Sequence, residues 1–107
     1  MEHPDAIIEV RWKTTAEGGR KTPLYPHELD SFRCPFLIDG EYFDCVLDIT
    51  GTAMELGETY QLPVSFLCWN LVGPRLKDGK FIALRECSIV ATGKVVRVLR
   101  DVEQTSK

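Results

Sequence analysis

Hydrophobic and polar residues alternate along several short segments of this chain, which is the pattern of β-strands with one buried face. In segment 6–13, Ile8, Val10 and Trp12 share one side, and charged residues occupy the other. Segment 42–49 alternates most regularly. Its residues that we expect to face the core are Phe43, Cys45, Leu47 and Ile49. Both segments are therefore predicted to be half-buried strands.

Four further segments combine apolar, β-branched and aromatic residues over lengths typical of strands. They are residues 32–38, 60–69, 81–86 and 89–99. Pro35 and Pro63 interrupt the first two of these segments. Because proline cannot donate a hydrogen bond to a neighbouring strand, we expect both positions at a sheet edge or a bulge. Gly93 predicts a bulge in the last strand.

The connections between these segments have the composition of turns and loops. Asp39-Gly40 is expected to form a hairpin turn, while segments 14–31 and 70–79 are expected to be loops without regular structure. No segment repeats apolar residues with a helical period, so no helix is expected between the strands. Six short strands without helices favour an all-β fold, either a closed antiparallel barrel or a sandwich.

The chain of 107 residues has the length of one domain with one core. Its content of 44% apolar and 27% charged residues is that of an ordinary globular protein. We find no membrane-spanning segment and no basic-then-apolar leader, and therefore expect a cytoplasmic protein without a membrane partner. The expected organisation is an N-terminal extension at 1–5, a β-barrel domain at 6–99 and a flexible C-terminal tail at 100–107.

The four cysteines lack the spacing of a metal site. They are Cys34, Cys45, Cys68 and Cys87. The first three lie in apolar, strand-like segments, so we expect buried free thiols, with no metal and no cofactor. The motifs of phosphate-binding loops, nucleophile elbows and metal-binding helices are also missing from the sequence. The composition and motifs therefore favour binding over catalysis.

The net charge of −3 is unlike that of a generic nucleic-acid binder, which neutralises phosphates with a basic face. Basic residues are concentrated in segments 11–21 and 75–85, and acidic residues in segment 39–48. Two interpretations fit this pattern, a two-sided charge distribution or ordinary solvated strand faces. Trp12 and Trp69 are expected to pack in the core or at its rim rather than to stack on bases.

Four short motifs, taken together in their order and approximate spacing, resemble the third domain of translation elongation factor Tu. They are residues 17–23 (Glu-Gly-Gly-Arg-Lys-Thr-Pro), 48–52 (Asp-Ile-Thr-Gly-Thr), 78–86 (Asp-Gly-Lys-Phe-Ile-Ala-Leu-Arg-Glu) and 93–96 (Gly-Lys-Val-Val). The resemblance extends from about Ala6 to Leu99 and implies a six-stranded antiparallel Greek-key β-barrel. In that family the barrel accompanies a GTPase domain, contacts aminoacyl-tRNA and docks other proteins.

The resemblance also implies where a partner would bind. Arg20 stands at the family's RNA-facing arginine, and Glu86 matches the glutamate that reaches the tRNA stem. Lys21 replaces the family's histidine, and Cys87 replaces a glycine next to Glu86. The candidate binding residues are Arg20, Lys21, Thr22, Arg85 and Glu86. Independently of the family, Arg20 and Lys21 follow two glycines, so we expect them on an exposed turn where long cations reach phosphates or acidic groups.

Together these observations predict a non-catalytic module that binds a protein or a structured, tRNA-like RNA and has no small-molecule substrate. The alternative is an immunity or antitoxin-type protein that uses the barrel to occupy a toxin's docking site. Two interpretations of Arg85 and Glu86 stay open, contact with a partner or an ion pair between the two that holds a hairpin. An enzyme would need a pocket that gathers Cys68, Asp44 and His27.

Overall fold

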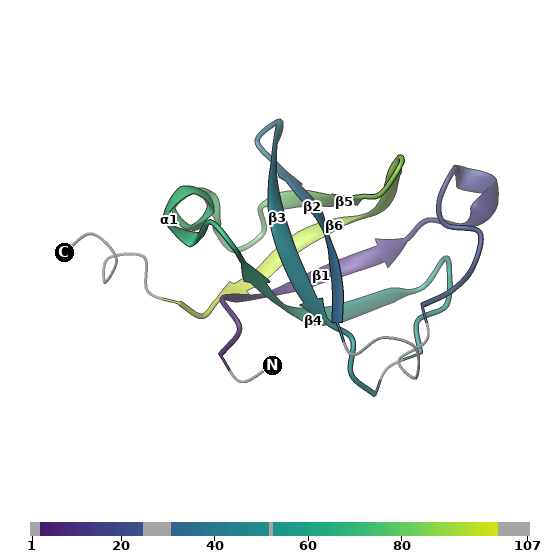
Figure 1. Cartoon of the computed structure of the whole chain (residues 1–107), viewed down its shortest axis with the longest axis horizontal. Helices are drawn as coiled ribbons and strands as arrows, with labels where there is room; N and C mark the ends of the chain where they lie inside the picture. The colour runs from purple at the N-terminus through teal and green to yellow at the C-terminus, as the bar shows by residue number, and fades with distance from the viewer. Residues whose placement is uncertain (1–2, 25–30, 52, 101–107) are drawn as a thin grey trace.

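The residues described by the computed structural model, 3–24, 31–51 and 53–100, fold into a closed barrel of six antiparallel β-strands (Figure 1). The strands are β1 (Ala6–Trp12), β2 (Ser31–Ile38), β3 (Glu41–Asp48), β4 (Thr59–Phe66), β5 (Phe81–Arg85) and β6 (Ile89–Val98). Each corresponds to one of the predicted segments. The predicted all-β barrel is therefore confirmed, and the sandwich alternative is wrong.

The strands follow the order β1-β4-β3-β2-β5-β6 around the barrel. β2, β3 and β4 are successive antiparallel neighbours, and β1 lies beside β4, which makes a Greek key. β5 pairs with β2, and β6 pairs with both β5 and β1, so the sheet closes on itself. Closure pairs strands that would otherwise present open edges to solvent.

Among the described residues, apolar side chains from the strands and from three of the connections between them fill the interior. The predicted inward residues of β1, Ile8, Val10 and Trp12, are at most 1% exposed. The indole Nε1 of Trp12 donates a hydrogen bond to the sulfur of Met54 at 3.3 Å. Trp69 is also buried, so both tryptophans belong to the core as expected.

Each strand proline lies within a continuous pairing on one side and at the end of a shorter pairing on the other; Pro35 is opposite Asp44 and Pro63 is opposite Ile7. Pro35 comes directly before Phe36 and Leu37, the two residues of β2 that pair with β5. Pro63 comes directly before residues 64–66, through which β4 pairs with β3. Although the barrel is closed, each proline is therefore one residue beyond a short strand pairing. The end of a strand pairing is equivalent to the predicted sheet edge, because a proline beyond that end is not required to donate a hydrogen bond to the neighbouring strand.

The predicted bulge at Gly93 is wrong, because Gly93 lies in regular register opposite Val10 of β1. The pairing of β6 shifts instead at Val90 and Val96, which have no Cα partner where their neighbours do. Gly93 has a different physical role. A Cβ at this position would overlap the backbone carbonyl of Glu9, so the close approach of β1 and β6 requires a residue without a side chain.

Short helical turns interrupt the connections that we expected to be irregular. Among the described residues these are α1 (Trp69–Val72), η1 (Thr15–Glu17) and η2 (Gly73–Arg75). The predicted strand at 60–69 accordingly ends at Phe66, and α1 turns Trp69 and Val72 into the core. The expectation of connections without helices is therefore wrong. No helix in the described part of the chain has the length and apolar character needed to cross a membrane.

The β2–β3 hairpin has the turn that Asp39-Gly40 predicts. The φ angles of Asp39 and Gly40 are 52° and 76°, so both residues are left-handed, as in the two-residue turns whose twist suits a hairpin. The thiols behave less uniformly than expected. Cys34 and Cys45 are buried and free as predicted, whereas Cys68 is exposed because it precedes α1 instead of lying in a strand.

Candidate partner-binding face

The loop between β1 and β2 begins with a capped helical turn. The Thr14 hydroxyl accepts a hydrogen bond from the Glu17 backbone N–H at 3.3 Å, and the Glu17 carboxylate accepts one from the Thr14 backbone N–H at 2.8 Å. Arg11 of β1 adds an ion pair to Glu17 at 3.0 Å. The backbone of Thr14 and the guanidinium of Arg11 lower the pKa of Glu17 below its ordinary value. This turn therefore starts the loop in a defined direction.

Hydroxyl groups then fasten the loop to itself and to the turn between β5 and β6. The Ser88 hydroxyl donates to the carbonyl oxygen of Gly18 at 3.0 Å. The Thr15 hydroxyl donates to the carbonyl oxygen of Arg20 at 2.8 Å. The first family-like motif thereby lies against the β5–β6 turn, which directly follows the third motif in the sequence.

Arg20 is held in place by three contacts. Its Nη1 lies 2.8 Å from both carboxylate oxygens of Glu86, and its Nε donates to the carbonyl oxygen of Thr22 at 3.1 Å. The guanidinium carbon also lies 5.5 Å from the ring centroid of Phe32, within cation–π range. The Arg20 side chain is only 20% exposed. The Arg20 side chain is therefore engaged within the barrel, whereas the turn exposes Lys21 as expected.

Arg85 pairs with an aromatic residue and not with its neighbour Glu86. Its Nη1 donates to the hydroxyl of Tyr42 in β3 at 3.1 Å, and its guanidinium carbon lies 5.4 Å from the centroid of the Tyr42 ring. Glu86 meanwhile binds Arg20. The proposed Arg85–Glu86 ion pair is wrong, because each of the two residues is engaged by a different element of the barrel.

The structure thus brings the five predicted residues together around the β5–β6 turn. Lys21 and Thr22 are exposed beside the Arg20–Glu86 ion pair, and Arg85 precedes Glu86 at the end of β5. Tyr42 joins them and was not among the predicted site residues. The sequence signal for Tyr42 is its position on the polar side of the alternating segment 42–49. A tyrosine on that side faces solvent and is available to a partner. We call Tyr42 and the five predicted residues the candidate face.

Apolar surface continues from the candidate face across the same strands. Tyr42 is 44% exposed, and the Leu37 backbone pairs with it from β2. Phe81, at the other end of β5 from Arg85, is 66% exposed. The outer surface of β3 and β5 therefore carries exposed aromatic rings beside exposed charged residues such as Arg33 and Asp44.

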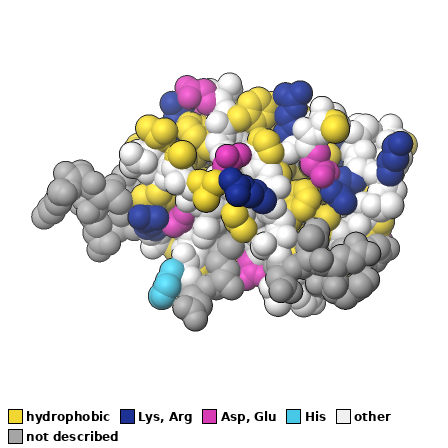
Figure 2. All heavy atoms as spheres, viewed as in Figure 1, with side chains coloured by type: hydrophobic (Ala, Val, Ile, Leu, Met, Phe, Trp, Pro, Cys, Tyr) yellow, Lys and Arg dark blue, Asp and Glu magenta, His cyan; other side chains and the backbone are white. Residues whose placement is uncertain are grey.

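Acidic and basic segments meet instead of separating. Arg75 forms ion pairs with Asp39 at 3.8 Å and with Glu41 at 3.0 Å, and Lys80 binds Asp39 at 2.7 Å. Figure 2 likewise shows basic and acidic side chains interspersed on the side in view. The acidic segment and the basic segment 75–85 therefore do not lie on opposite sides, because the β2–β3 hairpin carries Asp39 and Glu41 to Arg75 and Lys80.

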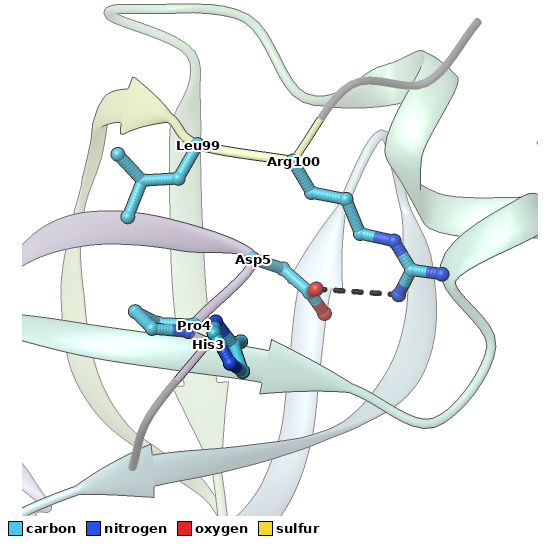
Figure 3. A pocket seen from close by; sticks show the side chains of 5 residues that line it. All are labelled: His3, Pro4, Asp5, Leu99 and Arg100. Atoms are coloured by element: carbon cyan, nitrogen blue, oxygen red, sulfur yellow. Dashed lines mark hydrogen bonds and ion pairs between the residues drawn. The ribbon is translucent and has the colours of Figure 1, made fainter. Parts of the chain in front are cut away.

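A second feature lies where the first and last strands meet. A surface pocket of about 470 Å³ is lined by His3, Pro4, Asp5, Leu99 and Arg100 (Figure 3). Asp5 is buried, and its carboxylate accepts hydrogen bonds from the Phe66 backbone N–H at 2.8 Å and from Arg100 at 3.3 Å. The Arg100 guanidinium also stacks 5.1 Å from Trp69. These contacts join β1, β4, α1 and the end of β6, which is a structural role.

The described residues contain no group of three or more His, Cys, Asp and Glu side chains able to hold a metal ion. His27 lies outside the described residues, so the enzyme hypothesis that combines it with Cys68 and Asp44 stays a prediction. No protein-family model matches the chain, and no curated protein sequence is significantly similar to it. Its function is therefore inferred from its fold and from the geometry of the candidate face.

Proposed function

We propose that this protein is a non-catalytic binding module that engages a protein partner through the candidate face. The six-stranded Greek-key barrel is the fold that the resemblance to the third domain of elongation factor Tu implies, and kinship with that domain is part of the proposal. Because one fold hosts many functions, the choice of partner depends on the side chains and not on the barrel.

The exposed pair of Arg85 and Tyr42 carries this proposal. Arginine and tyrosine are enriched at the energetic centres of protein interfaces, where a planar ring and a guanidinium bury large areas at low entropic cost. Here each holds the other in place by a hydrogen bond and a cation–π contact. The exposed ring of Phe81 and the half-buried Leu37 extend the apolar area that a protein partner would bury.

The arrangement of Arg20 argues against a nucleic-acid partner. Phosphate binding requires cations that are free to replace counterions. The guanidinium of Arg20 is already neutralised by Glu86 at 2.8 Å, and the carboxylate of Glu86 would face any approaching phosphate. Lys21 is the one member of the candidate face that is both cationic and without a hydrogen bond or ion pair to other described residues.

The proposal is tested by capturing the partner from the protein's own cell lysate with a tagged chain, with and without nuclease. We expect a protein that stays bound after nuclease treatment and is lost when Tyr42→Ala is used as bait. Association that disappears completely with RNA, and that is weakened by Arg20→Ala and by salt, would contradict it.

The immunity-type alternative is a particular case in which the protein partner is a toxin. The neutralised Arg20 favours it over RNA binding, since a protein that blocks a docking site does not need the phosphate contacts of the translation factor. Expression of the captured partner with and without this chain distinguishes the two functions. Growth arrest that the chain relieves identifies an immunity protein, and unaffected growth leaves the general binding module.

A further inference from the structure

Two thiols face each other in the core beneath the β2–β3 hairpin. Cys34 of β2 is the direct Cα partner of Cys45 in β3. The two residues are 3% and 0% exposed, and their sulfur atoms lie 4.0 Å apart. Neither thiol takes part in the candidate face.

The register places these cysteines within the range of a disulfide. Residues directly opposite in an antiparallel pair have Cα atoms about 4.5–5.5 Å apart. Disulfides span Cα separations of about 4.4–6.8 Å, with the sulfur atoms about 2.05 Å apart. The Cα separation expected for this register therefore fits a disulfide, and the sulfur atoms need to move from 4.0 Å to bonding distance.

We propose that Cys34 and Cys45 are a redox-active dithiol that small-molecule disulfides, such as oxidised glutathione, convert to a cross-strand disulfide. One cysteine thiolate attacks the oxidant, which breaks its S–S bond and releases one small thiol. The other cysteine thiolate then attacks the protein sulfur of this mixed disulfide and releases the second small thiol. Two electrons and two protons pass from the chain to the oxidant, so the reaction balances.

Burial determines how fast this reaction proceeds in the folded barrel. The contact with Cys34 and the burial of the site raise the pKa of the Cys45 thiol, so the reactive thiolate is scarce. The pairing of β2 with β5 is only two residues long, at Phe36 and Leu37. Opening of this short pairing is the route by which an oxidant reaches the thiols, and the exposed Cys68 and Cys87 react earlier.

The test uses the full chain with Cys68→Ser and Cys87→Ser, so that only the two core thiols react. The protein is unfolded in denaturant and refolded into buffer containing oxidised glutathione, which removes the limit that burial sets on access. We expect a folded monomer that is lighter by two hydrogens, has lost both titratable thiols and yields a peptide that joins Cys34 to Cys45. Dithiothreitol should restore both thiols without unfolding the barrel.

The matched control is Cys34→Ser in the same background, which should keep one free or glutathione-bound thiol. A refolded barrel that keeps two free thiols, or that carries glutathione on them, would overturn the proposal. The proposal would also be overturned if the chain formed the disulfide but lacked the far-ultraviolet circular dichroism of the barrel. The bond would then be incompatible with the fold. This inference does not depend on the proposed function.

Discussion

Asp5 contacts both neighbours of β1 through one buried carboxylate and its own backbone carbonyl. It accepts the backbone N–H of Phe66 and the guanidinium of Arg100, and its own carbonyl oxygen accepts the backbone N–H groups of Leu99 and Arg100. The backbone bonds survive any substitution, whereas the side-chain bonds do not. The Asp5 side chain therefore holds β4 and the end of β6 to the start of β1.

Replacement of Asp5 by Ala should lower the free energy of unfolding by about 2–3 kcal/mol, because a buried N–H loses its charged acceptor. Asp5→Asn is the matched control. It keeps an oxygen for Phe66 and loses only the ion pair with the 46%-exposed Arg100, which is worth under about 1 kcal/mol. Urea unfolding of both variants makes the comparison. Equal losses would mean that the ion pair, and not the backbone acceptor, is the important contact.

Glu17 gives the loop before β2 a pH dependence of defined sign. Its pKa is lowered from 4.5 by hydrogen bonds from the Thr14 backbone and from Arg11. A carboxylate with a lowered pKa contributes stability that is present above its unfolded-state pKa and is lost as the pH falls through its folded-state pKa. The thermal midpoint of the natural chain should therefore fall more steeply below about pH 4.5 than that of Glu17→Gln. Parallel midpoint curves for the two proteins would show that the capped turn has no such role.

At the scale of the elements, Gly93 is required by the packing of β6 on β1. Gly93→Ala should cost about 3 kcal/mol of unfolding free energy, because the new methyl group meets the Glu9 backbone, which cannot move without breaking the ladder. Gly51→Ala is the control, since Gly51 has a left-handed φ of 75° but open space around its Cα. Its cost should be about 1 kcal/mol. Denaturant titrations that rank the two variants in the opposite order would contradict this account of Gly93.

The ion pair between Arg20 and Glu86 should couple the β1–β2 loop to the β5–β6 turn. Arg20→Ala, Glu86→Ala and the double variant form a thermodynamic cycle. The side chains are 20% and 35% exposed, so solvent screening limits the expected coupling to about 1 kcal/mol. Strictly additive losses in unfolding free energy would show that the two elements are positioned by the backbone and hydroxyl contacts alone.

The strands could be predicted from the sequence because alternation of apolar residues is a local signal. A helix as short as α1 gives no such signal, since Trp69 and Val72 define less than two turns of a 3.6-residue period. The prediction of a bulge at Gly93 was wrong for a related reason. A glycine in a strand indicates either a bulge or a close approach of two backbones, and only the position of the neighbouring strand decides between them. The sequence pattern therefore predicted the strands but not the contacts between them.

The candidate site could be predicted only in part. The positions of Arg20 and Glu86 followed from the family resemblance, but their ion pair joins residues 66 positions apart and depends on the strand order of the barrel. The contact between Arg85 and Tyr42 has the same origin. Such long-range contacts changed the interpretation of the candidate site most, because they show that the positive charge of Arg20 is neutralised by Glu86.

For the whole molecule, the proposed function makes the barrel a scaffold that presents the candidate face to a partner. The ion pair with Glu86 neutralises Arg20, one of the three cations on that face, while Tyr42 and Phe81 provide exposed apolar area. A partner held by buried aromatic and guanidinium groups should bind with weak dependence on salt. Exposed phosphate contacts would instead give a steep dependence.

The measurement that tests this account most directly is the affinity of the captured partner for Arg85→Ala and for Arg97→Ala. Arg97 is an exposed arginine of β6 outside the candidate face, so the two variants remove the same chemical group from two places. We predict that Arg85→Ala weakens binding about tenfold or more, as loss of about 1.4 kcal/mol requires, and that Arg97→Ala leaves it unchanged. Equal affinities for the two variants would contradict the assignment of the candidate face.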